Sequence, residues 1–124
     1  MLTWDHVRIM HENDISFGSH TVTHPILSRV PISRARTELC ISKRVIEEKL
    51  GCPVKTFAYP NGKEEDFNET TKLLLKEAGY ICALTTIFGT NECNQDLFAL
   101  RRGQPWEKDL PTFAVKLQWY KFAY

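Results

Sequence analysis

The feature that most constrains the fold is an alternation of helix-like and strand-like segments through the middle of the chain. Residues 34–50 repeat apolar positions with a helical period and end at Gly51, and residues 54–59 alternate with β-branched and aromatic side chains. A second helix-like segment at 69–78 precedes an apolar run at 80–85. Helices that alternate with strands favour an α/β fold with a mainly parallel sheet.

A helix is also expected near the N-terminus, over residues 4–12. Thr3 is its candidate N-cap, because a threonine oxygen can accept a hydrogen bond from the first turn. Trp4, Val7 and Met10 recur on one face and predict a buried stripe. For the same reason Ser33 and Asn68 are the candidate N-caps of the two later helices.

The remaining segments complete the predicted organisation as one domain over residues 1–124. They are strands at 15–18 and 97–101, a loop at 88–96, a helix at 110–117 and an aromatic tail at 119–124. We expect this apolar tail to cover an open edge or a partner.

Composition excludes several classes of function. The formal net charge is +1, with acidic and basic residues interspersed, which predicts no nucleic-acid stripe. No apolar run approaches the roughly 20 residues of a membrane-spanning helix, and the N-terminus lacks the basic and apolar regions of a signal peptide. At 124 residues the chain is smaller than a complete eight-stranded α/β barrel.

The four cysteines show no spacing typical of a metal or redox site. We interpret them as free thiols, although the sequence alone leaves a disulfide between any two of them open. Cys40 and Cys82 lie within apolar runs and are expected to be buried.

Two histidines four residues apart are the strongest candidate for a functional site. His20 and His24 follow a short apolar run and Gly18, and Pro25 comes directly after them. This spacing can bring both imidazoles to one side of a helical turn, where they can share a cation. The same spacing is common among surface histidines, and a zinc site normally has a third protein ligand.

Two motifs resemble a known family. Residues 19–25 read Ser-His-Thr-Val-Thr-His-Pro, and residues 57–62 read Phe-Ala-Tyr-Pro-Asn-Gly. In this order and at this spacing they are similar to the metal-binding and substrate-groove motifs of the polysaccharide deacetylases with a NodB homology domain, carbohydrate esterase family 4. Further short similarities extend the resemblance over about residues 2–103.

The resemblance implies a partial, distorted (β/α) barrel and a metal-dependent hydrolase that removes acetyl groups from N-acetylated polysaccharide or sugar. His20 and His24 would bind a divalent metal, with zinc as the expected ion. The backbone N–H of Asn61 would stabilise the oxyanion, and Tyr59 and Pro60 would line the substrate groove.

The sequence departs from the family pattern at other catalytic positions. The upstream Asp-Asp motif, which supplies a metal ligand and the catalytic base, has no counterpart; Asp5, Asp14 and Asp66 are the nearest candidates. Ala58 stands where the family often has arginine, and no histidine follows His24 to act as general acid. We therefore expect a fragment with little activity alone, whose open sheet edge is covered by a missing N-terminal segment or by self-association.

Two other interpretations stay open at this point. The chain can be a non-catalytic carbohydrate- or partner-binding remnant of the deacetylase fold, or an α/β domain with an incidental histidine pair. The full-length relatives that the resemblance implies are often exported or associated with the cell envelope, but the sequence does not assign a location to this chain.

Overall fold

The computed structural model describes residues 2–103 and 109–120. Within these ranges the elements are, in chain order, α1 (Trp4–Glu12), η1 (Leu27–Arg29), α2 (Ile32–Leu50), β1 (Thr56–Ala58), η2 (Glu64–Asp66), α3 (Glu69–Glu77), β2 (Cys82–Leu84) and α4 (Leu110–Tyr120). The α/β class expected from the sequence is confirmed.

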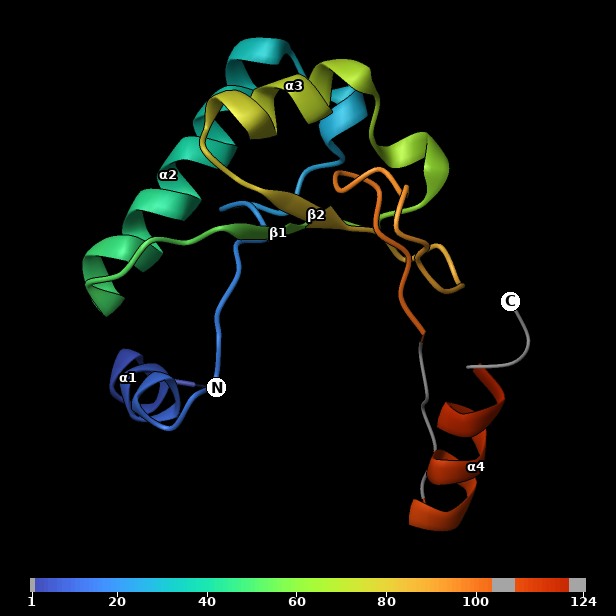
Figure 1. The fold of residues 1–124 in the computed structure, drawn as a ribbon. Helices are drawn as coiled ribbons and strands as arrows, with labels where there is room; N and C mark the ends of the chain where they lie inside the picture. The colour runs from blue at the N-terminus through green and yellow to red at the C-terminus, as the bar shows by residue number, and fades with distance from the viewer. Residues whose placement is uncertain (1, 104–108, 121–124) are drawn as a thin grey trace.

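A short parallel sheet lies at the centre of the molecule (Figure 1). β1 pairs with β2 in a register that places Phe57 opposite Ala83. Single parallel bridges extend the sheet on both sides, from Ser19 to Phe57 and from Leu84 to Leu100. Four extended segments therefore lie side by side in chain order and in one direction, and the described sheet is open.

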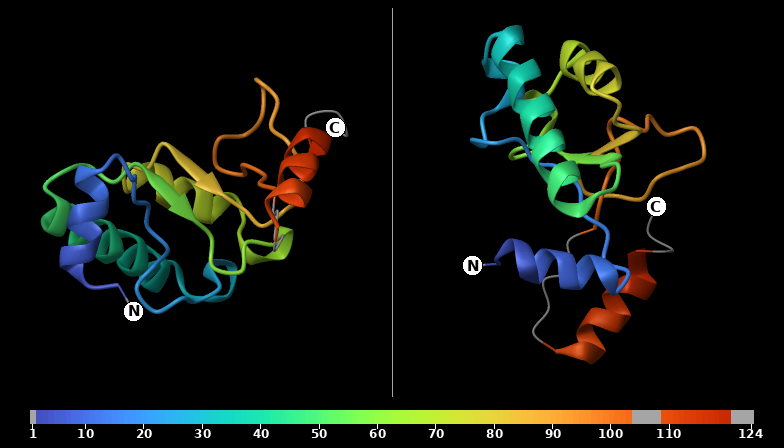
Figure 2. Two further views of the ribbon diagram at one scale, coloured as in Figure 1. Left: turned by 90° about the horizontal axis from the view of Figure 1, so that it is seen from below. Right: turned by 90° about the vertical axis from the view of Figure 1, so that its left-hand side faces the viewer.

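The core lies between the sheet and helices α2 and α3, which pack against each other over one face (Figures 1 and 2). Leu39 of α2 and Leu75 of α3 are fully buried beside Phe57 of β1. Tyr59 stacks on Phe67 with 4.4 Å between ring centroids. Burying these aromatic and aliphatic side chains stabilises the packing of the two helices on the sheet.

Local capping explains where the helices begin and end. The His6 N–H donates to Thr3 Oγ1, and the Thr71 N–H donates to Asn68 Oδ1 at 3.0 Å, which confirms both predicted caps. Gly51 ends α2 with φ 68°, a left-handed conformation that glycine adopts without strain. The predicted Ser33 cap is wrong. The helix begins at Ile32, two residues earlier than expected, with Pro31 at the N-cap. The Ala35 N–H donates to the Pro31 carbonyl at 2.9 Å and closes the first turn, so Ser33 lies inside the helix.

The two outer strands predicted from the sequence are not complete strands. Segment 15–18 forms no strand, and the bridge to β1 is made by Ser19 directly after it; segment 97–101 contributes only the bridge at Leu100. Each segment has a hydrogen-bonded neighbour on one side only among the described residues. A continuous ladder needs a longer run of paired backbone groups than either segment makes.

The predicted buried stripe on α1 is also wrong. None of its residues is buried, and Trp4 is 39% exposed. α1 contacts α2 but lies away from the sheet, as Figure 1 shows. Its apolar face therefore receives only partial cover from the described chain.

The structure describes all four cysteines as free thiols, as expected. The prediction that Cys40 and Cys82 are buried is wrong, because Cys40 is exposed and Cys82 is half-buried. Cys40 follows the buried Leu39, so one further helical step turns it outward. Cys82 precedes the buried Ala83, so the alternation of a strand places it on the opposite face.

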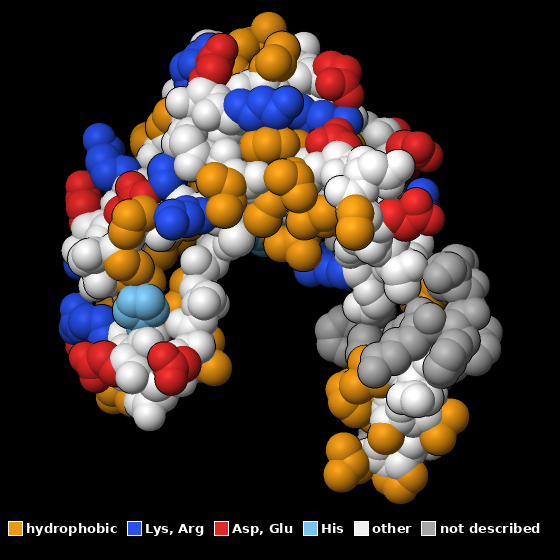
Figure 3. All heavy atoms as spheres, viewed as in Figure 1, with side chains coloured by type: hydrophobic (Ala, Val, Ile, Leu, Met, Phe, Trp, Pro, Cys, Tyr) orange, Lys and Arg blue, Asp and Glu red, His pale blue; other side chains and the backbone are white. Residues whose placement is uncertain are grey.

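Hydrophobic side chains also gather on the underside of the arch that Figure 3 shows, opposite the helices α2 and α3. Exposed apolar residues include Ile15, Val22, Ile81 and Leu97.

Within the described ranges, no helix is long and apolar enough to span a membrane. The predicted aromatic tail falls partly outside the described residues.

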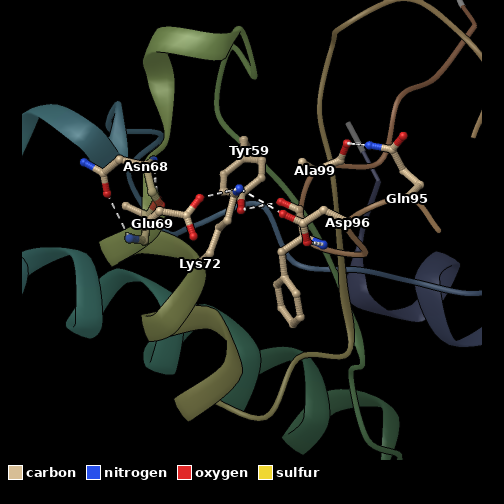
Figure 4. A network of polar contacts seen from close by, with 9 residues as sticks. Tyr59, Asn68, Glu69, Lys72, Gln95, Asp96 and Ala99 are labelled. Carbon is tan, nitrogen blue, oxygen red and sulfur yellow. Dashed lines mark hydrogen bonds and ion pairs between the residues drawn. The ribbon is translucent and has the colours of Figure 1, made fainter.

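An ion-pair network joins α3 to the segment after β2. Lys72 Nζ lies 2.7 Å from Glu69 Oε1 and 2.9 Å from Asp96 Oδ2, and Figure 4 shows it between the two carboxylates. The Phe98 N–H donates to Asp96 Oδ1 at 2.9 Å. The predicted loop at 88–96 is confirmed as lacking helix or strand, and this network fixes its end against α3.

Replacing Gly18 with alanine should destabilise the fold. The added methyl group would lie 2.5 Å from Thr56 Oγ1 and 3.0 Å from the Thr56 carbonyl oxygen, so it would push the Ser19 segment away from β1. We expect a loss of about 1–3 kcal/mol in the free energy of unfolding, measured by denaturant titration. In a Thr56→Ala background the loss should be smaller, because the nearer atom is gone. A Gly18→Ala variant as stable as the wild type would contradict the close packing.

The Asp96 ion pair should make stability depend on pH. Its hydrogen bond from Lys72 lowers the pKa of the Asp96 carboxyl from its ordinary value of 3.8, although burial acts in the opposite direction. A lowered pKa in the folded state adds stability above the unfolded pKa, and this stability is lost as the pH falls through the folded pKa. Asp96→Asn should therefore lower the melting temperature at neutral pH and have less effect in strong acid.

The size of this effect is limited, because the Asp96 side chain is 45% exposed and solvent screens the pair. The Lys72→Met variant is the matched control, since Asp96→Asn should have little effect once the ammonium group is absent. An Asp96→Asn effect that is equal at both pH values would contradict an electrostatic origin.

Candidate functional site

The backbone at Ser19 brings the two sequence motifs together. The Ser19 N–H donates to the Thr56 carbonyl at 3.0 Å, and the Ala58 N–H donates to the Ser19 carbonyl at 2.9 Å. The Ser19 hydroxyl also donates to Ser42 Oγ of α2 at 2.6 Å. His20 therefore lies at the end of β1, beside the start of the Tyr-Pro-Asn-Gly segment.

The two imidazoles lie next to each other. Their ring centroids are 4.8 Å apart with an interplanar angle of 75°, and both residues are exposed. His20 Nδ1 lies 2.7 Å from the Ala58 carbonyl oxygen. Because a carbonyl can only accept, Nδ1 carries a proton, and in the neutral imidazole Nε2 then keeps its lone pair. This is the usual arrangement of a histidine that is oriented for metal binding by a backbone carbonyl.

The histidines meet on a tight turn and not on the helical turn expected from the spacing. Thr21 has φ 67° and His24 has φ 56°, both in the left-handed region. The His24 N–H donates to Thr21 Oγ1 at 3.1 Å across the turn. As expected, His24 before Pro25 avoids the right-handed α region.

The second motif forms a fixed turn directly after β1. Asn61 and Gly62 have φ values of 60° and 74°. The Thr86 N–H donates to the Gly62 carbonyl at 2.8 Å, and the Thr86 hydroxyl donates to the Asn61 carbonyl at 2.7 Å. Asn61 is exposed, and within the described chain its N–H donates no hydrogen bond. A donor is thus held in place without an internal acceptor.

Tyr59 and Pro60, which the family resemblance assigns to a substrate groove, are buried in the described chain. Tyr59 is 1% exposed and its hydroxyl donates to the Phe98 carbonyl at 2.9 Å. This burial raises the pKa of Tyr59. Pro60 is fully buried as well. Both side chains are thus enclosed by the described chain, and their role in a substrate groove stays a prediction.

The three candidate aspartates do not join the histidine pair. Asp66 is 2% exposed and accepts a hydrogen bond from the Lys63 N–H at 3.0 Å, so it caps η2. Asp5 pairs with Arg8 on α1, and Asp14 is exposed after that helix. Among the described residues, no group of three or more His, Cys, Asp or Glu side chains is placed to hold a metal ion.

Glu38 of α2 contacts the histidine turn with its side chain, although neither motif includes it. Glu38 is buried, with Ala35, Leu39 and Ser42, on the face of α2 that packs inward. The available signal was a charged residue three positions after Ala35 and directly before Leu39, on the predicted apolar stripe. A charge at such a position is rare unless it has partners.

Comparisons with known proteins agree with the motifs. The sequence pattern of the polysaccharide deacetylase family matches residues 2–83. The Bacillus subtilis protein YxkH, which carries a polysaccharide deacetylase name, is 28% identical over 101 residues, which cover 82% of this chain and 35% of YxkH.

Solved structures give the same result. The Streptococcus pyogenes deacetylase PplD, in complex with acetate, superposes with a TM-score of 0.76 and 30% identity over 82% of this chain and 43% of its own. BC0361, a polysaccharide deacetylase from Bacillus cereus, has a TM-score of 0.69 and 28% identity over 82% of this chain and 31% of its own.

The chain thus spans about a third of the length of the curated relative that it matches. Its four parallel segments and covering helices correspond to an open part of the β/α barrel of these deacetylases. By sequence and by structure, the chain belongs to the polysaccharide deacetylase family.

Proposed function

We propose that this chain provides the histidine pair and the oxyanion turn of a metal-dependent hydrolase that removes acetyl groups from N-acetylated carbohydrate. The observation that carries the proposal is the juxtaposition of His20 and His24, with Nδ1 of His20 hydrogen-bonded to the carbonyl of Ala58 in the second motif. Membership of the deacetylase family and the likeness to a deacetylase in complex with acetate support it.

The histidine pair fits two positions of a divalent metal site. Both rings are exposed and adjacent, and the second nitrogen of His20 is left free for a cation. Zinc suits this set because imidazole nitrogens are among its usual ligands. When bound, such an ion lowers the pKa of a coordinated water and polarises a carbonyl group. The described residues do not complete the site, so the proposal requires another ligand.

Asn61 would stabilise the negative charge that develops on the acetyl oxygen during hydrolysis. Asn61 is exposed, its N–H has no acceptor among the described residues, and two hydrogen bonds from Thr86 fix the turn. A donor that is already oriented favours the transition state because it need not reorganise during the reaction. The backbone provides this group, so the side chain of Asn61 is not required for it.

A non-catalytic remnant that binds carbohydrate or a partner is the second candidate. The lack of a three-residue metal cluster in the described chain favours it, as does the burial of Asp66, Tyr59 and Pro60. Both candidates predict low activity for this chain alone, but only the first predicts that its histidines bind zinc.

The tautomer of His20 tests the proposed ligand geometry. Long-range proton–nitrogen NMR spectra of the neutral imidazoles should show the proton of His20 on Nδ1, because Nδ1 donates to Ala58. His6 is the matched control: its Nδ1 accepts from the Thr3 N–H at 3.3 Å, so its proton should be on Nε2. A proton on Nε2 of His20 would contradict the proposed orientation.

Zinc titration of the chain tests the function. Calorimetry should detect weak binding by the wild type and a loss of affinity of about tenfold or more in the His20→Ala/His24→Ala variant. The His6→Ala/His11→Ala variant, which removes the other two histidines, should bind zinc like the wild type. Equal affinities in all three proteins would refute the histidine assignment.

An acetate-release assay on chito-oligosaccharides completes this test. We expect the 124-residue chain to release little acetate, because the described residues place no third ligand beside the histidine pair and no histidine follows His24. Substantial release that is abolished by His20→Ala would show that the expected low activity is wrong, while supporting the deacetylase assignment itself.

A further inference from the structure

We propose that Glu38 is a positioning residue whose carboxylate holds the turn between His20 and His24 in the shape that binds metal. The inference rests on the proposed function for the role of the two histidines. Glu38 belongs to α2, and its described hydrogen bonds go to Val22 and Thr23 and not to either histidine. It would therefore act on the histidines through the backbone of the turn.

Both oxygens of the Glu38 carboxylate are used by the turn. Oε2 accepts from the Val22 N–H at 2.7 Å and from the Thr23 N–H at 2.9 Å, while Oε1 accepts from the Thr23 hydroxyl. The two amide groups are consecutive and lie between the histidines. One side chain therefore satisfies three donors within the three residues that separate the histidines.

The turn needs such a partner because its backbone is strained. Thr21 and His24 both have positive φ values, and a left-handed conformation is unfavourable for residues other than glycine. Thr21 is β-branched, which makes its conformation especially rare. Strained positions of this kind persist only where surrounding contacts hold them. The three bonds to Glu38 lie between the two strained residues.

The environment of Glu38 keeps its carboxylate charged. The residue is 6% exposed, and burial opposes ionisation, but the hydrogen bonds from Thr23 and Val22 and the charge of Arg34 together lower the pKa of the Glu38 carboxyl. A buried charge is unfavourable unless its hydrogen bonds are satisfied. Here the turn satisfies them, and no described hydrogen bond of the carboxylate goes to the core.

A second contact from the same helix face fixes the start of the turn. Ser42 lies one helical turn after Glu38 and accepts the hydrogen bond from the Ser19 hydroxyl. α2 therefore holds the residue before His20 through Ser42 and the residues before His24 through Glu38. The spacing of the two imidazoles depends on both attachments.

The test compares Glu38→Gln with Glu48→Gln in the full 124-residue chain. Both substitutions remove one carboxylate from α2, but Glu48 is exposed and pairs with Arg44, away from the turn. A glutamine at position 38 keeps the size but replaces one acceptor oxygen with a donor. We expect the zinc affinity to fall about tenfold or more in Glu38→Gln and to be unchanged in Glu48→Gln.

Two measurements separate positioning from general stability. In the metal-free protein, the amide proton resonances of Val22 and Thr23 should shift upfield in Glu38→Gln, because their charged acceptor is lost. A variant that is less stable in denaturant but binds zinc like the wild type would overturn the inference, as would unchanged amide resonances.

If Glu38→Gln does not fold, two less disruptive substitutions at Thr23 provide the test. Thr23→Val removes only the hydroxyl that donates to Glu38, and Thr23→Ser keeps it. The valine variant should bind zinc a few-fold more weakly than the serine variant, and equal affinities would overturn the inference.

If His20→Ala/His24→Ala binds zinc like the wild type, the proposed function fails. If that variant loses binding while the Glu38 and Thr23 variants do not, only the positioning role fails.

Discussion

The pairing of Ser19 with β1 is the interaction on which the candidate site depends. Two backbone hydrogen bonds, to Thr56 and from Ala58, place the residue before His20 at the end of the central strand. The next residue then reaches the Ala58 carbonyl with its imidazole, while the chain beyond β1 turns at Asn61. Segments separated by about forty positions in the sequence therefore meet at one edge of the sheet because they follow adjacent parallel strands.

Local signals predicted most of the regular structure. The caps at Thr3 and Asn68 and the end of α2 at Gly51 depend on one or two turns of chain, which the sequence displays directly. The outer strands depend on pairing with neighbouring segments. Whether 15–18 and 97–101 become strands is decided by the backbone groups that lie beside them, and an apolar run contains no information about its neighbours.

The candidate site was predictable to the extent that it consists of a motif. The spacing of His20 and His24 indicated a pair, and the structure brings their rings together. Tyr59 was assigned to the groove from the resemblance, although strand alternation puts it on the same face as the buried Phe57. Glu38 was missed because its role arises only when α2 packs across the histidine turn, which is a tertiary contact.

The two hydrogen bonds between Thr86 and the Asn61 turn limit how far this turn can move. They attach the turn to the segment that leaves β2, and Gly62 leaves no room there, since a side chain would come within 2.9 Å of the Thr86 nitrogen. A turn restrained in this way is rigid. In the proposed function this turn would be a rigid part of the site, and any adaptation to sugars of different shape would come from the parts of the protein around it.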